Sequence, residues 1–424
     1  MKTLYTGIDV ASQSFMMHLK NSEGISLGKS RQYDNTPEGI HTVEALLLNT
    51  LRSGGYERLA VGLEATAFYD WHLADALASS AALIAQGQVR VYRLNALRVS
   101  RFHKGAGEVD KTDKVDASVI ADFLRMARKL PAPHVAGDPV LPLKRLARFR
   151  FHSVGTLNRE TSHFLTHLFL QHSGLAQQKP LSDLTGATDL ALIEEFMTPD
   201  EIAHKPLEEL VNFLSTHGHS GFADPQAVAK NIHKAARESF ELRPELARSE
   251  HFILSSLMRN IRGLKASLKD IDHAIADQMK VFPNTLTSVP GLGPVYSAGI
   301  LSEIGDIRRF PDDDAVAKMA GLVWPRHNSA DFEAEDRRML RSANKYLRYH
   351  LVEAANAIRM HDASYRAYYE SKYQEVSKHK HKRALVLTAR KLVRLVFALL
   401  SKGQLYRSSP APQPAGRQHA VIVH

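Results

Sequence analysis

The stretch LYTGIDVASQSFMMHLKNSEG, residues 4–24, contains two short apolar runs that are separated and followed by turn-forming residues. Such runs are typical of β-strands, and the NSEG turn predicts a hairpin that continues into a third strand at about 25–32. Further strands are expected at 58–63 and 89–94, alternating with helices expected at 69–83, 95–104 and 113–130. This order indicates an α/β domain with a mixed sheet.

A proline-rich segment, LPAPHVAGDPVLP at 130–142, predicts a linker, and the chain beyond it has an almost entirely helical pattern. We therefore expect four parts. They are an α/β domain at 1–142, a helical middle at 143–282, a mainly helical C-terminal unit at 283–405, and a disordered tail at 406–424.

Apolar residues in the helical middle recur at alternating steps of three and four, which is the seam of a left-handed coiled coil. They are Leu254, Leu257, Ile261, Leu264, Leu268, Ile271 and Ile275. A helix with this seam can pair with a second subunit or pack within its own chain, and the spacing fits both.

Positive charge is concentrated in the last third of the chain. The formal net charge is +10, and residues 281–424 hold 22 Lys and Arg against 13 Asp and Glu. A concentrated basic region is typical of proteins that bind nucleic acid, although a solvated surface is the alternative. The absence of cysteine excludes disulfides, thiolate metal sites and a cysteine nucleophile. No apolar run is long enough to predict a membrane span or a signal peptide.

Four carboxylates stand at element boundaries of the expected α/β domain. Asp9 and Glu64 lie at the ends of two strands, and Asp113 and Asp116 lie three residues apart at a helix start. Gathered at one sheet edge, four carboxylates would repel one another unless a divalent cation neutralised them, and Mg²⁺ prefers oxygen ligands. Each residue alone could equally be a turn former or a helix cap.

In this order, Asp9, Glu64 and Asp113-x-x-Asp116 resemble the four-carboxylate (DEDD) transposases of the IS-110/IS-116/IS-902 insertion-sequence group. The resemblance implies a RuvC-like ribonuclease-H fold in which these four residues are catalytic and bind Mg²⁺. It also implies a cytoplasmic prokaryotic protein. Asp110 and Asp122 are nearby alternatives to the helix-start pair.

Residues 286–306 fit a helix-hairpin-helix pattern, with a turn at Gly291 and Gly293 whose backbone could approach a nucleic-acid phosphate. A tight turn between packed helices is the alternative. The segment 310–358 resembles the C-terminal domain of the same transposases, through its AGL motif and the run Ala343-Asn344-Lys345-Tyr346-Leu347-Arg348. That resemblance implies that Ser329 is the nucleophile. Ala330 and Ala343 stand where the family usually has glycine.

Basic and amide side chains of the C-terminal unit are candidate nucleic-acid contacts. Four of them recur at helical spacing, and four others lie in the run SKHKHKR at 377–383. A solvated helix face is the alternative for the first group, and a metal-binding tract is the alternative for the second. The candidates are Arg326, Arg337, Arg341, Asn344, Lys345, Arg348, Lys378, Lys380, Lys382 and Arg383.

The resemblance implies a transposase or site-specific recombinase that cleaves and exchanges DNA strands. It further implies donor and target DNA as partners, a noncoding bridge RNA as guide, and a homo-oligomer, either a dimer or a tetramer. Three other hypotheses stay open. The chain could be a metal-dependent junction-resolving nuclease that uses water, a non-enzymatic nucleic-acid-binding protein, or a tyrosine recombinase using Tyr346, which would leave the four carboxylates unexplained.

Overall fold

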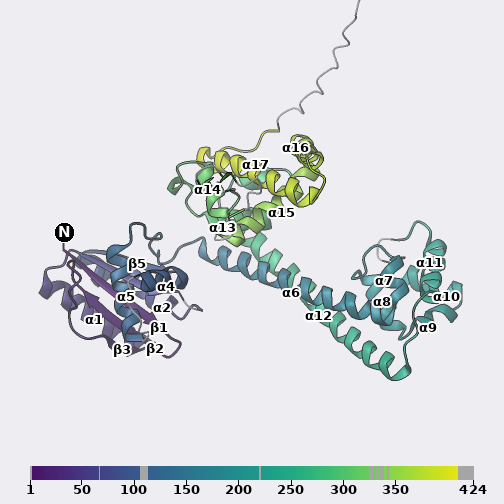
Figure 1. Ribbon diagram of the computed structural model, residues 1–424, viewed down its shortest axis with the longest axis horizontal. Helices are drawn as coiled ribbons and strands as arrows, with labels where there is room; N and C mark the ends of the chain where they lie inside the picture. The colour runs from purple at the N-terminus through teal and green to yellow at the C-terminus, as the bar shows by residue number, and fades with distance from the viewer. Residues whose placement is uncertain are drawn as a thin grey trace, which may run out of the picture. The chain divides into compact units, whose positions relative to one another are not determined.

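The computed structural model describes residues 2–65, 67–105, 113–218, 221–324, 328–329, 332–333, 339–340 and 343–408, without the side chains of 113–115, 328–329 and 332–333. It divides into two compact units, residues 1–139 and 140–424, which are described separately below (Figure 1). The predicted tail therefore lies almost wholly outside the described residues.

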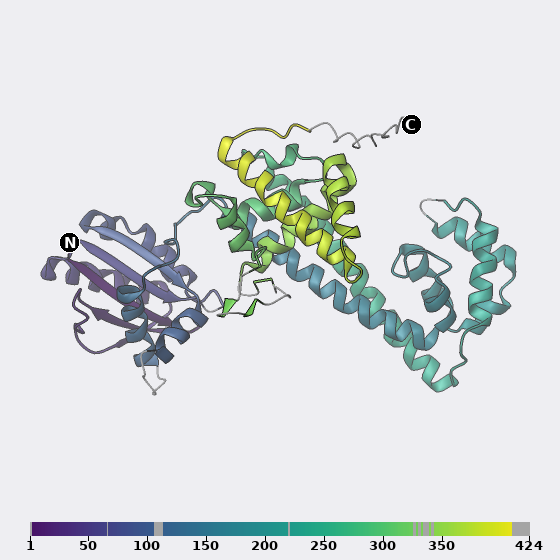
Figure 2. The same cartoon turned by 45° about the horizontal axis from the view of Figure 1, so that its top comes forward.

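The N-terminal unit is an α/β domain (Figure 2). Its elements are β1 Thr3–Val10, β2 Ser14–Lys20, β3 Arg31–Asp34, α1 Pro37–Gly54, β4 Arg58–Glu64, α2 Trp71–Ser79, α3 Ala81–Gln86, β5 Gln88–Leu94, α4 Ala96–Gly105 and α5 Asp113–Met126.

The strands form one five-stranded sheet in the order β3-β2-β1-β4-β5. β1 pairs parallel to β4, and β4 pairs parallel to β5. β2 is antiparallel to both of its neighbours, so it alone opposes the direction of the other strands. This mixed sheet with helices packed on it confirms the predicted α/β domain.

The two faces of the sheet are covered by different helices. One face packs its apolar residues, among them Leu4, Ile8 and Val61, against α1, α2 and α3. The opposite face, which includes Tyr92 and Leu94, packs against α4 and α5. Because successive side chains of a strand point to opposite faces, the parity of a residue number decides which helices a strand residue meets.

Two glycines let α5 lie directly on the sheet. Gly7 and Gly62 face each other across β1 and β4. A Cβ added to Gly7 would lie 2.0 Å from the carbonyl oxygen of Ala117, and one added to Gly62 would lie 2.9 Å from a methyl of Leu124. The backbone of α5 therefore touches β1, and a side chain at Gly7 would force the two elements apart.

Gly7→Ala is expected to destabilise the chain by about 3 kcal/mol, because overpacking against a backbone oxygen cannot be relieved by a rotamer change. Urea denaturation measures the effect. Gly105→Ala is the matched control, since a Cβ there meets nothing within 4 Å. A Gly7→Ala chain as stable as the control would contradict this account of the α5 contact.

The third strand begins later than expected. β3 spans Arg31–Asp34, whereas residues 25–30 form only one isolated bridge, between Lys20 and Ser26. Gly28 has a φ of +107°, and the hydroxyls of Ser26 and Ser30 contact the two ring nitrogens of His18 at 2.9 Å. These side-chain contacts and the left-handed glycine displace the start of regular pairing.

The first part of the second unit is a long helical hairpin that carries a cluster of short helices (Figure 1). α6 and α12 run antiparallel, as the Arg150–Asp272 and His167–Glu250 contacts along them show. The elements are α6 Leu141–Gln171, α7 Ser173–Gln178, α8 Ala187–Glu195, α9 Pro199–His204, α10 Leu207–His217, α11 Pro225–Arg237 and α12 Pro244–Met279.

The predicted coiled-coil seam lies on α12. Within this chain, Leu254, Ile261 and Ile275 of that seam are fully buried. Leu254 and Ile261 share one cluster with Phe164 of α6, and Ile275 shares another with Leu143 of α6. Part of the seam is therefore used inside the chain, and pairing with a second subunit stays a prediction.

The C-terminal part of the second unit packs around one apolar core that includes Leu286, Leu322, Leu351 and Leu392. No described helix is both long and apolar enough to cross a membrane. The elements are η1 Leu286–Ser288, α13 Pro294–Ile304, η2 Ile307–Arg309, α14 Asp313–Ala320, β6 Asn328–Ser329, β7 Phe332–Glu333, α15 Lys345–His361, α16 Ala363–Gln374 and α17 Lys380–Lys402.

Candidate functional site

Asp9 and Glu64 stand at the ends of the two central parallel strands. Asp9 is the penultimate residue of β1 and Glu64 is the last residue of β4. Asp9 lies two residues beyond Gly7, and Glu64 two residues beyond Gly62, so both point to the face that α5 covers. Each is half-buried, which leaves part of the carboxylate accessible. The two predicted residues are therefore neighbours on one face at one end of the sheet.

The start of α5 lies at the same end of the sheet. Ala117 of α5 meets Gly7, whereas Asp122 binds Lys20, which pairs with Tyr5 in the sheet. As α5 proceeds it therefore moves from Gly7 toward the start of β1, and its first turn lies beside Asp9. That first turn contains Asp113 and the half-buried Asp116. The side chain of Asp113 lies outside the described residues.

The alternatives to this pair have different positions. Asp122 forms ion pairs with Lys20 of β2 and with Arg125 of α5, whose Nη2 lies 3.4 Å from Oδ1 of Asp122. Its carboxylate is therefore engaged by these two cations. Asp110 lies outside the described residues. His103 of α4, which the sequence analysis did not single out, has its Nδ1 3.4 Å from Oδ1 of Asp116. Nothing in the local sequence RFHKG marks this histidine, because the contact joins two helices.

The donor set fits a hard divalent cation, which prefers carboxylate oxygens. Asp9, Glu64 and Asp116 share one face and one end of the sheet, and the first turn of a helix favours negative charge. No three described carboxylate or imidazole side chains are close enough to hold a metal ion by themselves. Asp113, whose side chain is not described, is the fourth predicted ligand.

Two polar contacts fix the loops that follow the strand ends. The Asn35 amide donates to the carbonyl oxygens of Ala11 and Tyr69, at 3.0 and 3.1 Å. Asp70, which is fully buried, accepts two hydrogen bonds from Arg93 of β5. The loop after Asp9 and the loop after Glu64 are therefore tied to each other and to the sheet.

The second candidate region surrounds Ser329. The backbone of Ser329 pairs with Phe332 in the two-stranded β6–β7 hairpin. The backbone of Ser329 therefore lies in a short β-hairpin. Three of the predicted basic contacts, Arg326, Arg337 and Arg341, lie outside the described residues.

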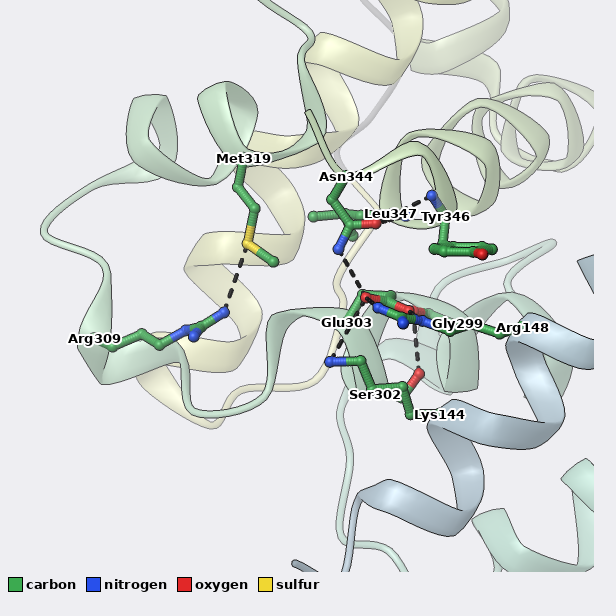
Figure 3. Close-up of polar contacts among 10 residues, drawn as sticks. All are labelled: Lys144, Arg148, Gly299, Ser302, Glu303, Arg309, Met319, Asn344, Tyr346 and Leu347. Carbon is green, nitrogen blue, oxygen red and sulfur yellow. Dashed lines mark hydrogen bonds and ion pairs between the residues drawn. The ribbon is translucent and has the colours of Figure 1, made fainter. Parts of the chain in front are cut away.

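The predicted Asn344 caps α15. Its side-chain oxygen accepts from the backbone N–H groups of Tyr346 and Leu347, each at 3.1 Å, and its amide donates to Glu303 at 2.7 Å (Figure 3). Lys345 is exposed beside it, with Nζ 5.1 Å from the centre of the Tyr346 ring. The chain therefore presents a cationic side chain at a helix start, where N–H groups favour anions.

Glu303 is a functional candidate that the sequence did not reveal. Its side chain is fully buried on α13, and Arg148 of α6 donates to both of its oxygens, at 2.5 and 2.9 Å. Burial alone would raise the pKa of this carboxyl, but the Arg148 hydrogen bonds and the charges of Lys144 and Arg148 hold the pKa below its usual value. The carboxylate is therefore ionised inside the fold.

The glycine turn before α13 differs from two paired α-helices. A single 3₁₀ turn, Leu286–Ser288, precedes it. Gly291 has a φ of +86°, and a Cβ there would lie 2.9 Å from the backbone of Ala357, so this glycine packs against α15. Gly293 is exposed at the start of α13 and meets nothing within 4 Å. Of the two, Gly293 alone leaves its backbone open to a partner.

The basic run lies across the start of α17, and most of it is exposed. Lys378, Lys382 and Arg383 are exposed, and Lys380 lies over the Tyr373 ring at 5.4 Å. Arg383 also contacts Glu375 at 2.9 Å. Exposed cations beside aromatic rings can bind both the phosphates and the bases of a nucleic acid.

Two family models match separate parts of the chain. A DEDD transposase model of the IS110 type matches residues 6–171, and the model described as "Transposase IS116/IS110/IS902 family" matches residues 284–370. The chain belongs to this transposase family. The first match contains the four carboxylates of the α/β domain of this transposase, and the second contains Ser329 and Asn344.

Relatives of this transposase come from insertion elements of Streptomyces and Mycobacterium species. The IS116 "uncharacterized 44.8 kDa protein" of Streptomyces clavuligerus is 27% identical, covering 78% of this chain and 81% of the relative. The IS900 "uncharacterized 42 kDa protein" of Mycobacterium paratuberculosis is 26% identical, covering 86% and 89%. Among solved structures, RuvC of Thermus thermophilus with a Holliday junction substrate is 17% identical, with a TM-score of 0.23, covering 32% of this chain and 99% of RuvC.

Proposed function

We propose that this chain is a site-specific DNA recombinase that moves a prokaryotic insertion sequence by cleaving and exchanging DNA strands. The observation that carries the proposal is the position of Asp9, Glu64 and Asp116 on one face and at one end of the sheet, in a chain of this transposase family. Carboxylates from three different elements rarely share one edge for stability, because they repel one another.

Asp9, Glu64, Asp113 and Asp116 would hold the divalent cation, for which Mg²⁺ is the proposed ion. When bound, the cation stabilises negative charge on the scissile phosphate and on the oxygen that leaves it. The half-burial of Asp9, Glu64 and Asp116 supports this role, because each keeps part of its carboxylate accessible to a ligand. The ties made by Asn35 and Asp70 hold the strand-end loops, so the carboxylates are positioned before DNA arrives.

Ser329 is the proposed nucleophile. Its Oγ attacks the phosphorus of a DNA phosphodiester, and the bond from phosphorus to the 3′-oxygen breaks. The serine proton passes to a general base or solvent, the departing 3′-oxygen takes up a proton, and a 5′-phosphoserine linkage remains. A 3′-hydroxyl of another strand then attacks that linkage, which restores the serine and joins the strands. The second family match, which contains Ser329, and the pairing of Ser329 with Phe332 in a short hairpin support this assignment.

DNA and RNA contacts are proposed for the C-terminal unit, in which the basic excess lies. A noncoding bridge RNA would pair with donor and target DNA, and the protein would work as a dimer or tetramer in the prokaryotic cytoplasm. We assign catalysis to residues 1–142, the helical connection to 143–282 and the serine-bearing part to 283–405. The proposed contacts are Gly291, Gly293, Arg326, Arg337, Arg341, Asn344, Lys345, Arg348, Lys378, Lys380, Lys382 and Arg383.

Metal removal tests the proposal. DNA carrying the element's ends, incubated with the protein, its element-encoded RNA and Mg²⁺, is expected to yield cleaved strands, and excess EDTA is expected to reduce cleavage by at least about a hundredfold. Binding to DNA, measured by gel shift, should persist in EDTA, because the basic C-terminal unit carries it, and should weaken with added salt. Cleavage that is equal with and without EDTA would contradict the metal assignment. Salt-sensitive binding without cleavage in any divalent metal would favour a non-enzymatic binding protein.

A further inference from the structure

We propose that Glu303 is a positioning residue for strand cleavage: through Asn344 it fixes the start of α15 and the base of the segment that carries Ser329. This inference rests on the proposed function, because it assigns Glu303 to the reaction of Ser329. The proposal concerns a residue that touches neither DNA nor the reacting phosphate. It would act by holding other groups in place.

Glu303 is at the centre of a contact among three helices. It lies one residue before the end of α13, it receives Arg148 and Lys144 from α6, and it receives Asn344 from the start of α15 (Figure 3). Arg148 donates to both oxygens of Glu303, and its guanidinium also lies 4.5 Å from the centre of the Tyr346 ring. A buried carboxylate is expensive unless its lone pairs are filled, and here they are filled by side chains from both neighbouring helices.

Asn344 uses both ends of its amide. The oxygen caps α15 through two backbone N–H groups, and the nitrogen donates to Oε2 of Glu303 at 2.7 Å. A flip of the amide would turn a donor toward the helix N–H groups and an acceptor toward the carboxylate, so both sets of bonds would be lost. Glu303 therefore selects the orientation in which Asn344 caps the helix.

Two backbone hydrogen bonds join the residues that precede the Ser329 segment to the residues that follow it. The Leu340 N–H donates to the Val323 carbonyl at 3.1 Å, and the Asn344 N–H donates to the Met319 carbonyl at 2.8 Å. Gly321, with a φ of +72°, packs so closely that an added Cβ would lie 2.7 Å from Cβ of Ala343 and from the Leu340 oxygen. A shift of Asn344 is therefore transmitted to the base from which the β6–β7 hairpin extends.

This arrangement gives Glu303 more than a packing role. Glu303 is the only charged residue among those of α13 that the structure buries, and its helix neighbour Ile304 belongs to the apolar core. Well-packed apolar replacements of buried ion pairs are often neutral or stabilising, so stability alone does not account for a charge at this position. Orienting a neighbouring side chain is a role that an apolar residue could not fill. The orientation that it serves is that of Asn344, which begins the helix carrying Lys345 and Arg348.

The test uses Glu303→Gln and Asn344→Ser in the full chain. Glutamine offers one acceptor oxygen where Arg148 and Asn344 need two, so a donor amide would face another donor. Serine is a good N-cap but is too short to reach Glu303, so Asn344→Ser removes the link and keeps the cap. Asp272→Asn is the matched control, because Asp272 of α12 accepts two hydrogen bonds from Arg150 of α6, and this pair does not include Asn344.

Two readouts are needed. Amide hydrogen exchange at Leu340 and Asn344 should accelerate in both variants and stay unchanged in Asp272→Asn. The rate of covalent protein–DNA adduct formation at saturating DNA should fall by about tenfold or more in both variants, because small displacements of reacting groups cost large rate factors. DNA affinity should stay unchanged in Glu303→Gln, since Glu303 is not one of the proposed DNA contacts. The Asn344→Ser variant decides the outcome if Glu303→Gln does not fold.

The outcomes separate this inference from the proposed function. No adduct with the wild-type chain would defeat the proposed function and, with it, the inference. A wild-type adduct together with an unchanged adduct rate in Asn344→Ser would overturn the Glu303 inference alone. Accelerated exchange without a change in adduct rate would also overturn it, because Glu303 would then serve only the stability of the fold.

Discussion

Asp9→Asn is expected to reduce DNA cleavage by at least about a hundredfold while leaving DNA affinity within about twofold. Asparagine has the shape of aspartate but lacks the charge that binds a divalent cation. Asp9 also has the central position in the proposed site, between Glu64 on the neighbouring strand and the first turn of α5. Affinity should persist because the basic groups proposed to hold DNA lie in the C-terminal unit.

The measurement compares initial cleavage rates over a range of Mg²⁺ concentrations. Asp34→Asn is the matched control, since Asp34 is an exposed carboxylate on the edge strand of the same sheet. The control should cleave at the wild-type rate. Wild-type cleavage by Asp9→Asn at every Mg²⁺ concentration would remove Asp9 from the metal site and would defeat the carboxylate assignment.

Ser329→Ala is expected to abolish the covalent protein–DNA adduct altogether, because alanine has no oxygen that could bond to phosphorus. The adduct is detected by denaturing gel electrophoresis of labelled DNA after the protein is unfolded. Ser377→Ala, which removes an exposed hydroxyl beside the basic run, is the control and should form the adduct normally.

The same experiment discriminates the nuclease alternative. A junction-resolving nuclease that uses water would leave no adduct in the wild type and would still cleave with Ser329→Ala. Cleavage that persists at the wild-type rate in this variant would therefore exclude Ser329 as nucleophile. It would leave the carboxylate site in place.

The sheet and its carboxylate edge were predictable from sequence because the signals are local. Apolar runs bounded by turn formers predicted β1, β2, β4 and β5, and all four strands lie where expected within one or two residues. Asp9 and Glu64 follow directly from those strand ends, and the ends of parallel strands meet at one edge. Their placement on the α5 face is a finding of the structure, because it depends on the close approach allowed by Gly7 and Gly62.

Two helices of the N-terminal unit differ from the prediction. The helix expected at 69–83 is split at Ser80, whose extended backbone and hydroxyl begin a new helix by capping Leu83. Helix α1 was not predicted, although Thr36 caps it and Gly55 ends it in the left-handed conformation. The capping threonine and the terminal glycine are local signals that mark both ends of this helix in the sequence.

Glu303 could not have been predicted, because its partners are distant in the sequence. Arg148 lies 155 residues away and Asn344 lies 41 residues away. In the sequence, Glu303 is one acidic residue near the end of an apolar helix, which is usually a solvated position. Only the fold shows that it is buried and that it joins three helices.

The central claim of the proposal is that strand cleavage needs both the carboxylates of residues 1–142 and the hydroxyl of Ser329. Mass spectrometry of the digested protein–DNA adduct tests it most directly, in the wild type and in Asp9→Asn. The account predicts a nucleotide attached through a 5′-phosphate to Ser329, in the tryptic peptide spanning 327–337, in the wild type and at least about a hundredfold less in Asp9→Asn. An attachment at any other residue, or equal attachment in the two proteins, would contradict it.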